Sequence, residues 1–259
     1  MSGNLNLVRQ LVRREVSVQF KGTFLGYVWA FARPLLMLVV YTVVFGMIFR
    51  RDVDGEPLGG YAVSMFCGLS IYTIFSTSVA ASCMSVVSRR GLVKQVVFPL
   101  VVLPLVQVLS AFILSIPWFV LLAIGVLWVH GSIPWTALLV PLWLVPLFLL
   151  TQGCAWLVAS LGVYFRDMKQ LVPVVLQVLF FMSPIFWRLE SVESRLPRLA
   201  AYLKVNPLTV IIEETRRLVF AAELPNWSCL TVVMVGALIV FVLGLAWFQK
   251  TKKGFADVI

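Results

Sequence analysis

Residues 89–99 read RRGLVKQVVFP, a short basic segment between two long uncharged stretches. The 28 residues of Tyr61–Ser88 and the 71 residues of Gln95–Phe165 contain no Asp, Glu, Lys or Arg. An apolar run of about 18 residues is long enough to cross a bilayer as a helix. Because charges are expensive inside the hydrocarbon, we expect the segment 89–99 to lie at a water interface between two membrane spans.

The composition of the whole chain is typical of a membrane protein. Of its 259 residues, 61% are hydrophobic and 12% are charged, and the mean hydropathy is +0.99. A soluble domain carries about 25% charged residues. The start of the chain holds several arginines and no apolar core before a cleavage site, so we expect no signal peptide. The expected fold class is all-α integral membrane.

Six transmembrane helices are expected in a single domain covering residues 1–259. Their approximate ranges are 27–49, 61–88, 101–129, 135–164, 171–187 and 227–248. The third and fourth spans are separated at His130–Pro134, because Gly and Pro interrupt helices. Kinks or late starts are expected at four prolines of these two spans, namely Pro104, Pro117, Pro141 and Pro146.

An amphipathic helix is expected before the first span, over residues 5–21. Val8, Val12 and Val16 recur on one helical face, whereas the arginines of this segment lie off that face. A basic helix with one apolar face is typical of a helix lying on the membrane surface.

Two short helices are expected in the polar region before span six. Pro197 opens the first, and Asn206 as N-cap with Pro207 in the first position opens the second. Glu213 and Arg217 are spaced as an i,i+4 pair of opposite charge. Two such helices can shape the exit of a transport path, and a solvated connector is the alternative.

The charges are distributed unevenly between the two sides of the membrane. Six spans place both termini on one side, which collects 13 basic and three acidic residues, while the other side has eight of each. The positive-inside rule makes the basic side cytoplasmic. We therefore expect a bacterial cytoplasmic (inner) membrane protein with both termini in the cytoplasm. Because the basic residues lie in short juxtamembrane pieces, the charge does not indicate nucleic-acid binding.

No motif in the chain indicates an enzyme. There is no GxxxxGK[ST] phosphate-binding loop, so ATP hydrolysis by this chain is not expected. The four cysteines fit no metal-binding spacing, and His130 is the single histidine. The spans contain no paired acids of the kind that ion-coupled carriers use. Energy for transport is therefore expected to enter from a partner at the cytoplasmic face.

Six short segments together resemble a known family. They are KGTFLGYVWAFARPL (21–35), GLVKQVVFP (91–99) with Leu103 and Pro104, YFRDM (164–168), SPIFW (183–187), NPL (206–208) and the closing GFADVI (254–259). In this order they resemble the membrane (permease) subunit of ABC-2 type polysaccharide exporters, of the O-antigen kind. The chain is also similar to teichoic-acid and capsule exporters.

The resemblance implies a homodimer docked on two copies of a separate ABC ATPase, which would bind ATP and Mg in place of this chain. The cargo would be a glycan on polyprenyl pyrophosphate, exported through a channel. The segment 89–99 would be the coupling segment that contacts the ATPase, and the region 188–226 would carry external gate helices. The coupling candidates are Arg89, Arg90, Leu92, Val93, Lys94, Val96 and Phe98.

A pyrophosphate cargo calls for cations near the cytoplasmic interface, and guanidinium groups suit phosphate oxygens. The candidates are Arg9, Arg13, Arg14, Lys21 and Arg33. Arg33 lies furthest into an apolar run. Anchoring on anionic lipid is the alternative for each of them.

Aromatic rings offer flat apolar faces to many sugars without a fixed hydrogen-bond register. The candidates for lining a glycan channel are Trp29, Phe31, Tyr41, Phe45, Phe49, Tyr72, Phe75, Phe180, Phe181 and Trp187. Aromatic belts at the membrane interface are the alternative. Two other functions also stay open at this point. One is export of a small drug or lipid, and the other is a membrane transferase that uses Asp167.

Overall fold

The structure is a computed structural model and describes residues 2–44, 58–89, 91 and 99–258. Every regular element within these ranges is helical, which confirms the all-α class. The helices are α1 (Ser2–Phe20), α2 (Trp29–Tyr41), α3 (Leu58–Cys83), α5 (Val102–Leu114), α6 (Ile116–His130), α7 (Val140–Tyr164), α8 (Met168–Met182), α9 (Leu189–Arg195), α10 (Pro197–Val205), α11 (Pro207–Arg216), α12 (Trp227–Thr251) and α13 (Phe255–Val258). Short 3-10 turns are η1 (Gly26–Val28), η3 (Val87–Arg89), η4 (Trp135–Leu139) and η6 (Lys252–Gly254), and η5 (Arg217–Ala221) is a π turn.

Within the described residues, five helical segments are long and apolar enough to cross a membrane. They are Gly26–Val44, Leu58–Cys83, Val102–His130, Trp135–Tyr164 and Trp227–Gly254. A sixth apolar helix, α8, has 15 residues, so it is shorter than the predicted span 171–187. It ends at Met182 because the residue before Pro184 disfavours helical backbone. The chain is an integral membrane protein with several spans.

The second membrane span ends earlier than predicted. The second span was predicted to reach Ser88, but α3 ends at Cys83 and is followed by a turn and by η3. In this turn the Ser85 hydroxyl donates a hydrogen bond to the Ser82 carbonyl at 2.7 Å, which offers the backbone an alternative to the helix. The predicted end of the first span, at residue 49, lies outside the described residues.

Pro117 and Pro141 lie at interruptions of the third and fourth spans, as predicted, whereas Pro146 lies inside the continuous helix α7. Ser115 separates α5 from α6, because Pro117 has no N–H and its ring clashes with the carbonyl four residues earlier. Pro141 lies in the first turn of α7, where a missing N–H costs nothing. Each span is therefore made of two pieces, α5 with α6 and η4 with α7.

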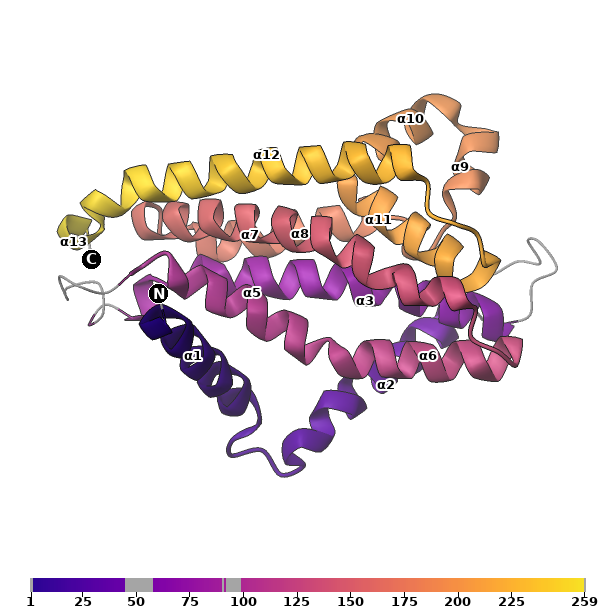
Figure 1. Ribbon diagram of the computed structural model, residues 1–259, viewed down its shortest axis with the longest axis horizontal. Helices are drawn as coiled ribbons and strands as arrows, with labels where there is room; N and C mark the ends of the chain where they lie inside the picture. Colours follow the sequence, from indigo (N-terminus) through magenta and orange to yellow (C-terminus); the bar gives the residue numbers. More distant parts are fainter. Residues whose placement is uncertain (1, 45–57, 90, 92–98, 259) are drawn as a thin grey trace.

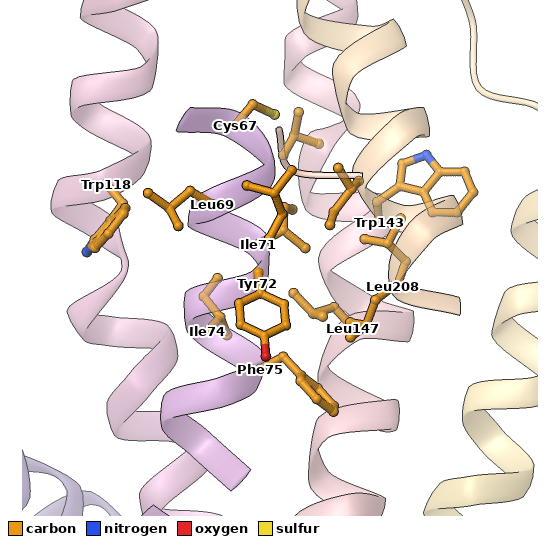
Figure 2. Packing of buried hydrophobic residues seen from close by; sticks show 14 of the residues in the cluster. Cys67, Leu69, Ile71, Tyr72, Ile74, Phe75, Trp118, Trp143, Leu147 and Leu208 are labelled. Carbon is orange, nitrogen blue, oxygen red and sulfur yellow. The ribbon is translucent and has the colours of Figure 1, made fainter. Parts of the chain in front are cut away.

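Helix α3 lies at the centre of the bundle (Figure 1) and contacts α5, α6, α7, α8 and α11. Of the residues in its most apolar stretch of 18, 83% are buried. Phe66, Ile71 and Ile74 are each at most 1% exposed. Figure 2 shows the buried side chains of α3 between Trp118 of α6 and Leu147 of α7. A helix that is apolar all round belongs in such a buried position.

Helices α7 and α12 pack with their backbones in direct contact. A Cβ atom added to Gly153 of α7 would lie 2.5 Å from the carbonyl oxygen of Val240 on α12. Gly244 of α12 faces the backbone of Gly153 in the same way. Small residues permit this close approach of helices in a membrane. The two glycines therefore set the separation of these helices.

The two chain ends lie at the same end of the bundle, and α9, α10 and α11 lie at the other end (Figure 1). Helix α1 packs against α5, with Val12 buried at 7% exposure. The apolar face predicted for this helix therefore contacts protein. Near the C-terminus, Phe248 and Phe255 form a second small core with Trp156 of α7.

Candidate functional site

Three of the aromatic residues predicted to line a channel come together around one cavity. This cavity has a volume of about 350 Å³ and lies between α2, α3 and α8. Its wall includes Tyr41, Tyr72 and Phe180, together with Arg33. The ring centroid of Phe180 is 6.2 Å from that of Tyr41 and 5.2 Å from that of Tyr72. We call this space the aromatic cavity.

Phe186 joins this ring cluster, which the sequence did not reveal. Its ring centroid lies 5.1 Å from that of Phe180 and 5.4 Å from that of Tyr41. The Tyr61 hydroxyl donates a hydrogen bond to the Phe186 carbonyl at 3.0 Å. Phe186 lies in the non-helical turn after α8, and no local pattern in SPIFW shows that this turn folds back onto α2. The rings meet at tilted or edge-on angles, which aromatic pairs prefer.

The other predicted aromatic residues lie apart from this cluster or at its edge. Trp29 and Phe31 are exposed on α2, whereas Phe75 is buried in the core. Phe181 contacts Phe180 but is exposed, and Trp187 donates a hydrogen bond from Nε1 to the Phe181 carbonyl at 3.4 Å. A channel role for each of these residues stays a prediction. Two further candidates, Phe45 and Phe49, lie outside the described residues.

The cations predicted to bind pyrophosphate lie on α1, after it, and on α2. Their side chains are exposed in all five cases, Arg9, Arg13, Arg14, Lys21 and Arg33. Arg33 differs from the others because it lines the aromatic cavity and a second, larger cavity. Within the described part of the chain it forms no ion pair. The phosphate-binding role stays a prediction for all of them.

Of the predicted coupling residues, the structure describes Arg89. Its Nη2 atom lies 2.5 Å from Oε2 of Glu15, with both side chains about one-quarter exposed, at 24% and 25%. This ion pair ties η3, at the start of the coupling segment, to α1. The remaining coupling candidates lie outside the described residues, namely Arg90, Leu92, Val93, Lys94, Val96 and Phe98.

The segment between α8 and α12 contains the two predicted helix starts. Pro197 lies in the first turn of α10, and Pro207 lies in the first turn of α11. Asn206 caps α11, because its side chain accepts a hydrogen bond from the Leu208 N–H at 3.0 Å. The count of two helices was wrong, since α9 precedes them. Arg188 occupies the N-cap position of α9 in extended conformation without a side-chain cap, so no start signal was visible.

The predicted Glu213–Arg217 ion pair is also wrong. Arg217 pairs instead with Glu214 at 2.7 Å and with Glu223 at 2.6 Å, and Glu213 pairs with Arg216 at 3.2 Å. The α-helical spacing between Glu213 and Arg217 is kept, since the Arg217 N–H still bonds the Glu213 carbonyl. Nearer partners decide the pairing, because Arg216 takes Glu213 and Arg217 turns to Glu214 and Glu223. The hydrogen bonds that Arg217 donates to the Glu223 carboxylate raise the pKa of Arg217 above its ordinary value, so the guanidinium stays charged.

Arg216 is the residue of this segment that sequence reasoning missed. Its side chain is 8% exposed. Nε donates to the Ser64 carbonyl of α3 at 3.1 Å, and Nη2 donates to the Ile185 carbonyl at 2.8 Å. Nη1 lies 3.5 Å from the Trp187 carbonyl. One buried guanidinium thus ties α11 to α3 and to the turn that carries Phe186.

This arrangement satisfies backbone that would otherwise be costly. The residues Ser183–Trp187 are not helical, and Ile185 is 1% exposed. Buried carbonyls without a partner cost free energy, most of all where water is excluded. Gly68 makes room for the arginine, because a Cβ atom there would lie 3.1 Å from Nη2. The segment between α8 and α12 and the aromatic cavity are therefore mechanically connected.

The family model for ABC-2 type transporters matches residues 6–220 of this chain. This match covers most of the chain, and the chain belongs to the ABC-2 type transporter family. It is a transporter component with a membrane domain built from helices, in agreement with the fold.

Similar proteins are found along almost the whole chain. The chain is 28% identical over 257 residues to "O-antigen export system permease protein RfbA" of Myxococcus xanthus, covering 98% of this chain and 95% of that protein. It is 26% identical over 259 residues to the protein of the same name in Klebsiella pneumoniae, with the same coverage. It is 25% identical over 249 residues to "Polysialic acid transport protein KpsM" of Escherichia coli, covering 95% of this chain and 93% of that protein.

Proposed function

We propose that this chain is the permease subunit of an exporter that carries an O-antigen-like polysaccharide across the cytoplasmic membrane. The observation that carries the proposal is its similarity, over 98% of its length, to permeases named for O-antigen export. The aromatic cavity supports it, because grouped aromatic rings suit the apolar faces of sugars. Ion-coupled carriers instead place groups that bind ions near the middle of the membrane. The polymer is linked to polyprenyl pyrophosphate in this proposal.

In the proposed complex, two copies of the chain work with two copies of a separate ABC ATPase, which binds ATP and Mg. The chain itself catalyses no reaction. The Arg89–Glu15 ion pair supports a coupling role for the segment 89–99, because force received there has a direct route into α1. The basic residues gathered on the side of both termini support a cytoplasmic position for that side.

The test is deletion of the gene and complementation by the intact chain in the source bacterium. Deletion should remove the surface polysaccharide and cause lipid-linked glycan to accumulate inside the cell. The purified chain should show no ATP turnover until the partner ATPase is added. Polysaccharide that reaches the surface at normal levels in the deletion strain would refute the proposal.

Two alternatives give different results in the same strain. An exporter of a small drug or lipid would make the deletion strain sensitive to that compound without trapping glycan. A transferase would lose activity on substitution of Asp167, which is exposed just before α8.

A further inference from the structure

A second cavity lies on the other side of Arg33. It has a volume of about 550 Å³ and is enclosed by the end of α1, by α2, α3 and α5, and by the start of α6. Its size is within the range of small-molecule sites, about 300–1,000 Å³. We call it the polar crevice, because two helices turn rows of polar side chains toward it. Thr73 and Thr77 belong to α3, and Gln107 and Ser110 belong to α5.

A buried hydroxyl of α5 in this crevice lacks a partner among the described residues. Ser110 is 2% exposed, and its hydroxyl makes no hydrogen bond within the described structure. Gln107, one helical turn before it, is 8% exposed and lines the same crevice. Burying an unpaired hydroxyl costs about 1–3 kcal/mol. The unpaired Ser110 hydroxyl, with the Gln107 amide beside it, indicates that the crevice is built for a polar occupant.

The crevice also offers a cation and a flat ring. Arg33 is exposed and forms no ion pair among the described residues, so its guanidinium is available to an anion in the crevice. Trp118 is held in place by stacking on Phe66, with ring centroids 5.3 Å apart and an angle of 11° between the rings. Both Arg33 and Trp118 also line the aromatic cavity, so the two spaces meet at these residues.

A phosphate next to a sugar matches these groups. The guanidinium suits phosphate oxygens, the amide and hydroxyls suit sugar hydroxyls, and the indole suits a sugar ring face. An acyl chain would leave Gln107 and Ser110 unpaired. We propose that the polar crevice binds the lipid-proximal end of the substrate, with the phosphate at Arg33 and the first sugar at Gln107 and Ser110.

This inference rests on the proposed function and adds a recognition step to it. The lipid-proximal end is the same for a polymer of any length, so a site for it recognises the cargo independently of chain length. Because Arg33 borders both cavities, a phosphate held there keeps the first sugar at the entrance to the aromatic cavity. The polar crevice then selects the cargo, and the aromatic cavity passes the sugars that follow.

The test measures binding to the purified full-length chain in lipid nanodiscs. The probes are farnesyl diphosphate alone and farnesyl diphosphate linked to glucose, galactose or N-acetylglucosamine. At least one sugar-linked probe should bind about tenfold or more tightly than the probe without sugar. Gln107→Leu and Ser110→Ala should each weaken that probe by about 5- to 30-fold and leave farnesyl diphosphate unchanged. Arg33→Gln should weaken all probes.

Gln152→Leu is the matched control. Gln152 of α7 is also buried without a partner among the described residues, but it lines neither cavity. Its substitution should leave all four affinities unchanged. Ser110→Ala removes one atom, so the test stands even where Gln107→Leu does not fold.

Two results would overturn the inference. One is equal binding of all four probes, which would show that the crevice holds water or bilayer lipid. The other is a loss of affinity in Gln152→Leu as large as in Gln107→Leu. Neither result touches the proposed function, because that proposal depends on surface polysaccharide in the deletion strain and is decided in cells.

Discussion

Replacing Arg216 with methionine should loosen the turn Ser183–Trp187 and disrupt the aromatic cavity. The change removes the donors to the Ser64 and Ile185 carbonyls, at 3.1 Å and 2.8 Å. A hydrogen bond to a charged group contributes about 1.5–3 kcal/mol. Two of them predict a loss of about 3–6 kcal/mol in the free energy of unfolding. The Trp187 contact, at 3.5 Å, is too long to add much.

Arg216→Lys tests geometry separately from charge. Nε and Nη2 of a planar guanidinium reach two carbonyls on different segments, whereas a single ammonium does not have this fork. We therefore expect the lysine variant to lose at least half of the stabilisation although it keeps the charge. Lys204→Met is the matched control, because Lys204 pairs with Glu193 while both side chains are about half exposed, at 47% and 52%, and its loss should cost about 1 kcal/mol or less.

Two assays follow these variants. Thermal unfolding in detergent measures stability. Cross-linking by a short bifunctional thiol reagent measures position, with cysteines at Tyr41 and Phe186 in a background free of the native cysteines. The ring centroids of these residues are 5.4 Å apart, so the intact turn should cross-link efficiently and the Arg216→Met turn should not. Equal stability and equal cross-linking in Arg216→Met and Lys204→Met would refute the reasoning.

Three further predictions address packing, capping and coupling. Gly244→Ala should cost about 1–3 kcal/mol of stability, because the added methyl group overpacks against α7. Its control is Gly236→Ala in the same helix, which has open space around it and should change stability by less than about 1 kcal/mol. Similar shifts of the thermal unfolding temperature in the two variants would contradict this prediction. Asn226→Ala removes two bonds from the start of α12 and should cost about 1 kcal/mol in the same unfolding assay. Arg89→Glu should reduce export, because it breaks the ion pair with Glu15. The double variant Arg89→Glu with Glu15→Arg restores opposite charges and should restore export. Export that stays lost in the double variant would assign Arg89 to another contact.

Much of this protein could be predicted from local patterns. The uncharged stretches on both sides of residues 89–99 predict membrane spans, because charge is excluded from hydrocarbon regardless of how helices pack. The break at Pro117 and the cap at Asn206 follow from missing or available hydrogen-bond groups within a few residues. Such features need no knowledge of distant segments.

Other features depended on local signals that were absent or misleading. Helix α9 has no side-chain cap, so nothing marked its start. The pairing of Glu213 with Arg217 followed from helical spacing, but each of these residues has another partner, Arg216 for Glu213 and Glu214 with Glu223 for Arg217. The coupling segment itself stays a prediction beyond Arg89, because residues 92–98 lie outside the described residues.

The sequence by itself determined that this chain spans a membrane by several helices, and which short segments resemble polysaccharide exporters. Only the tertiary structure decided which polar and aromatic groups share a site. Arg216 meets Ser64 across 152 positions of the chain, and Phe186 meets Tyr41 across a comparable distance. Hydrophobic and charge patterns are local properties, whereas such contacts depend on how whole helices pack together.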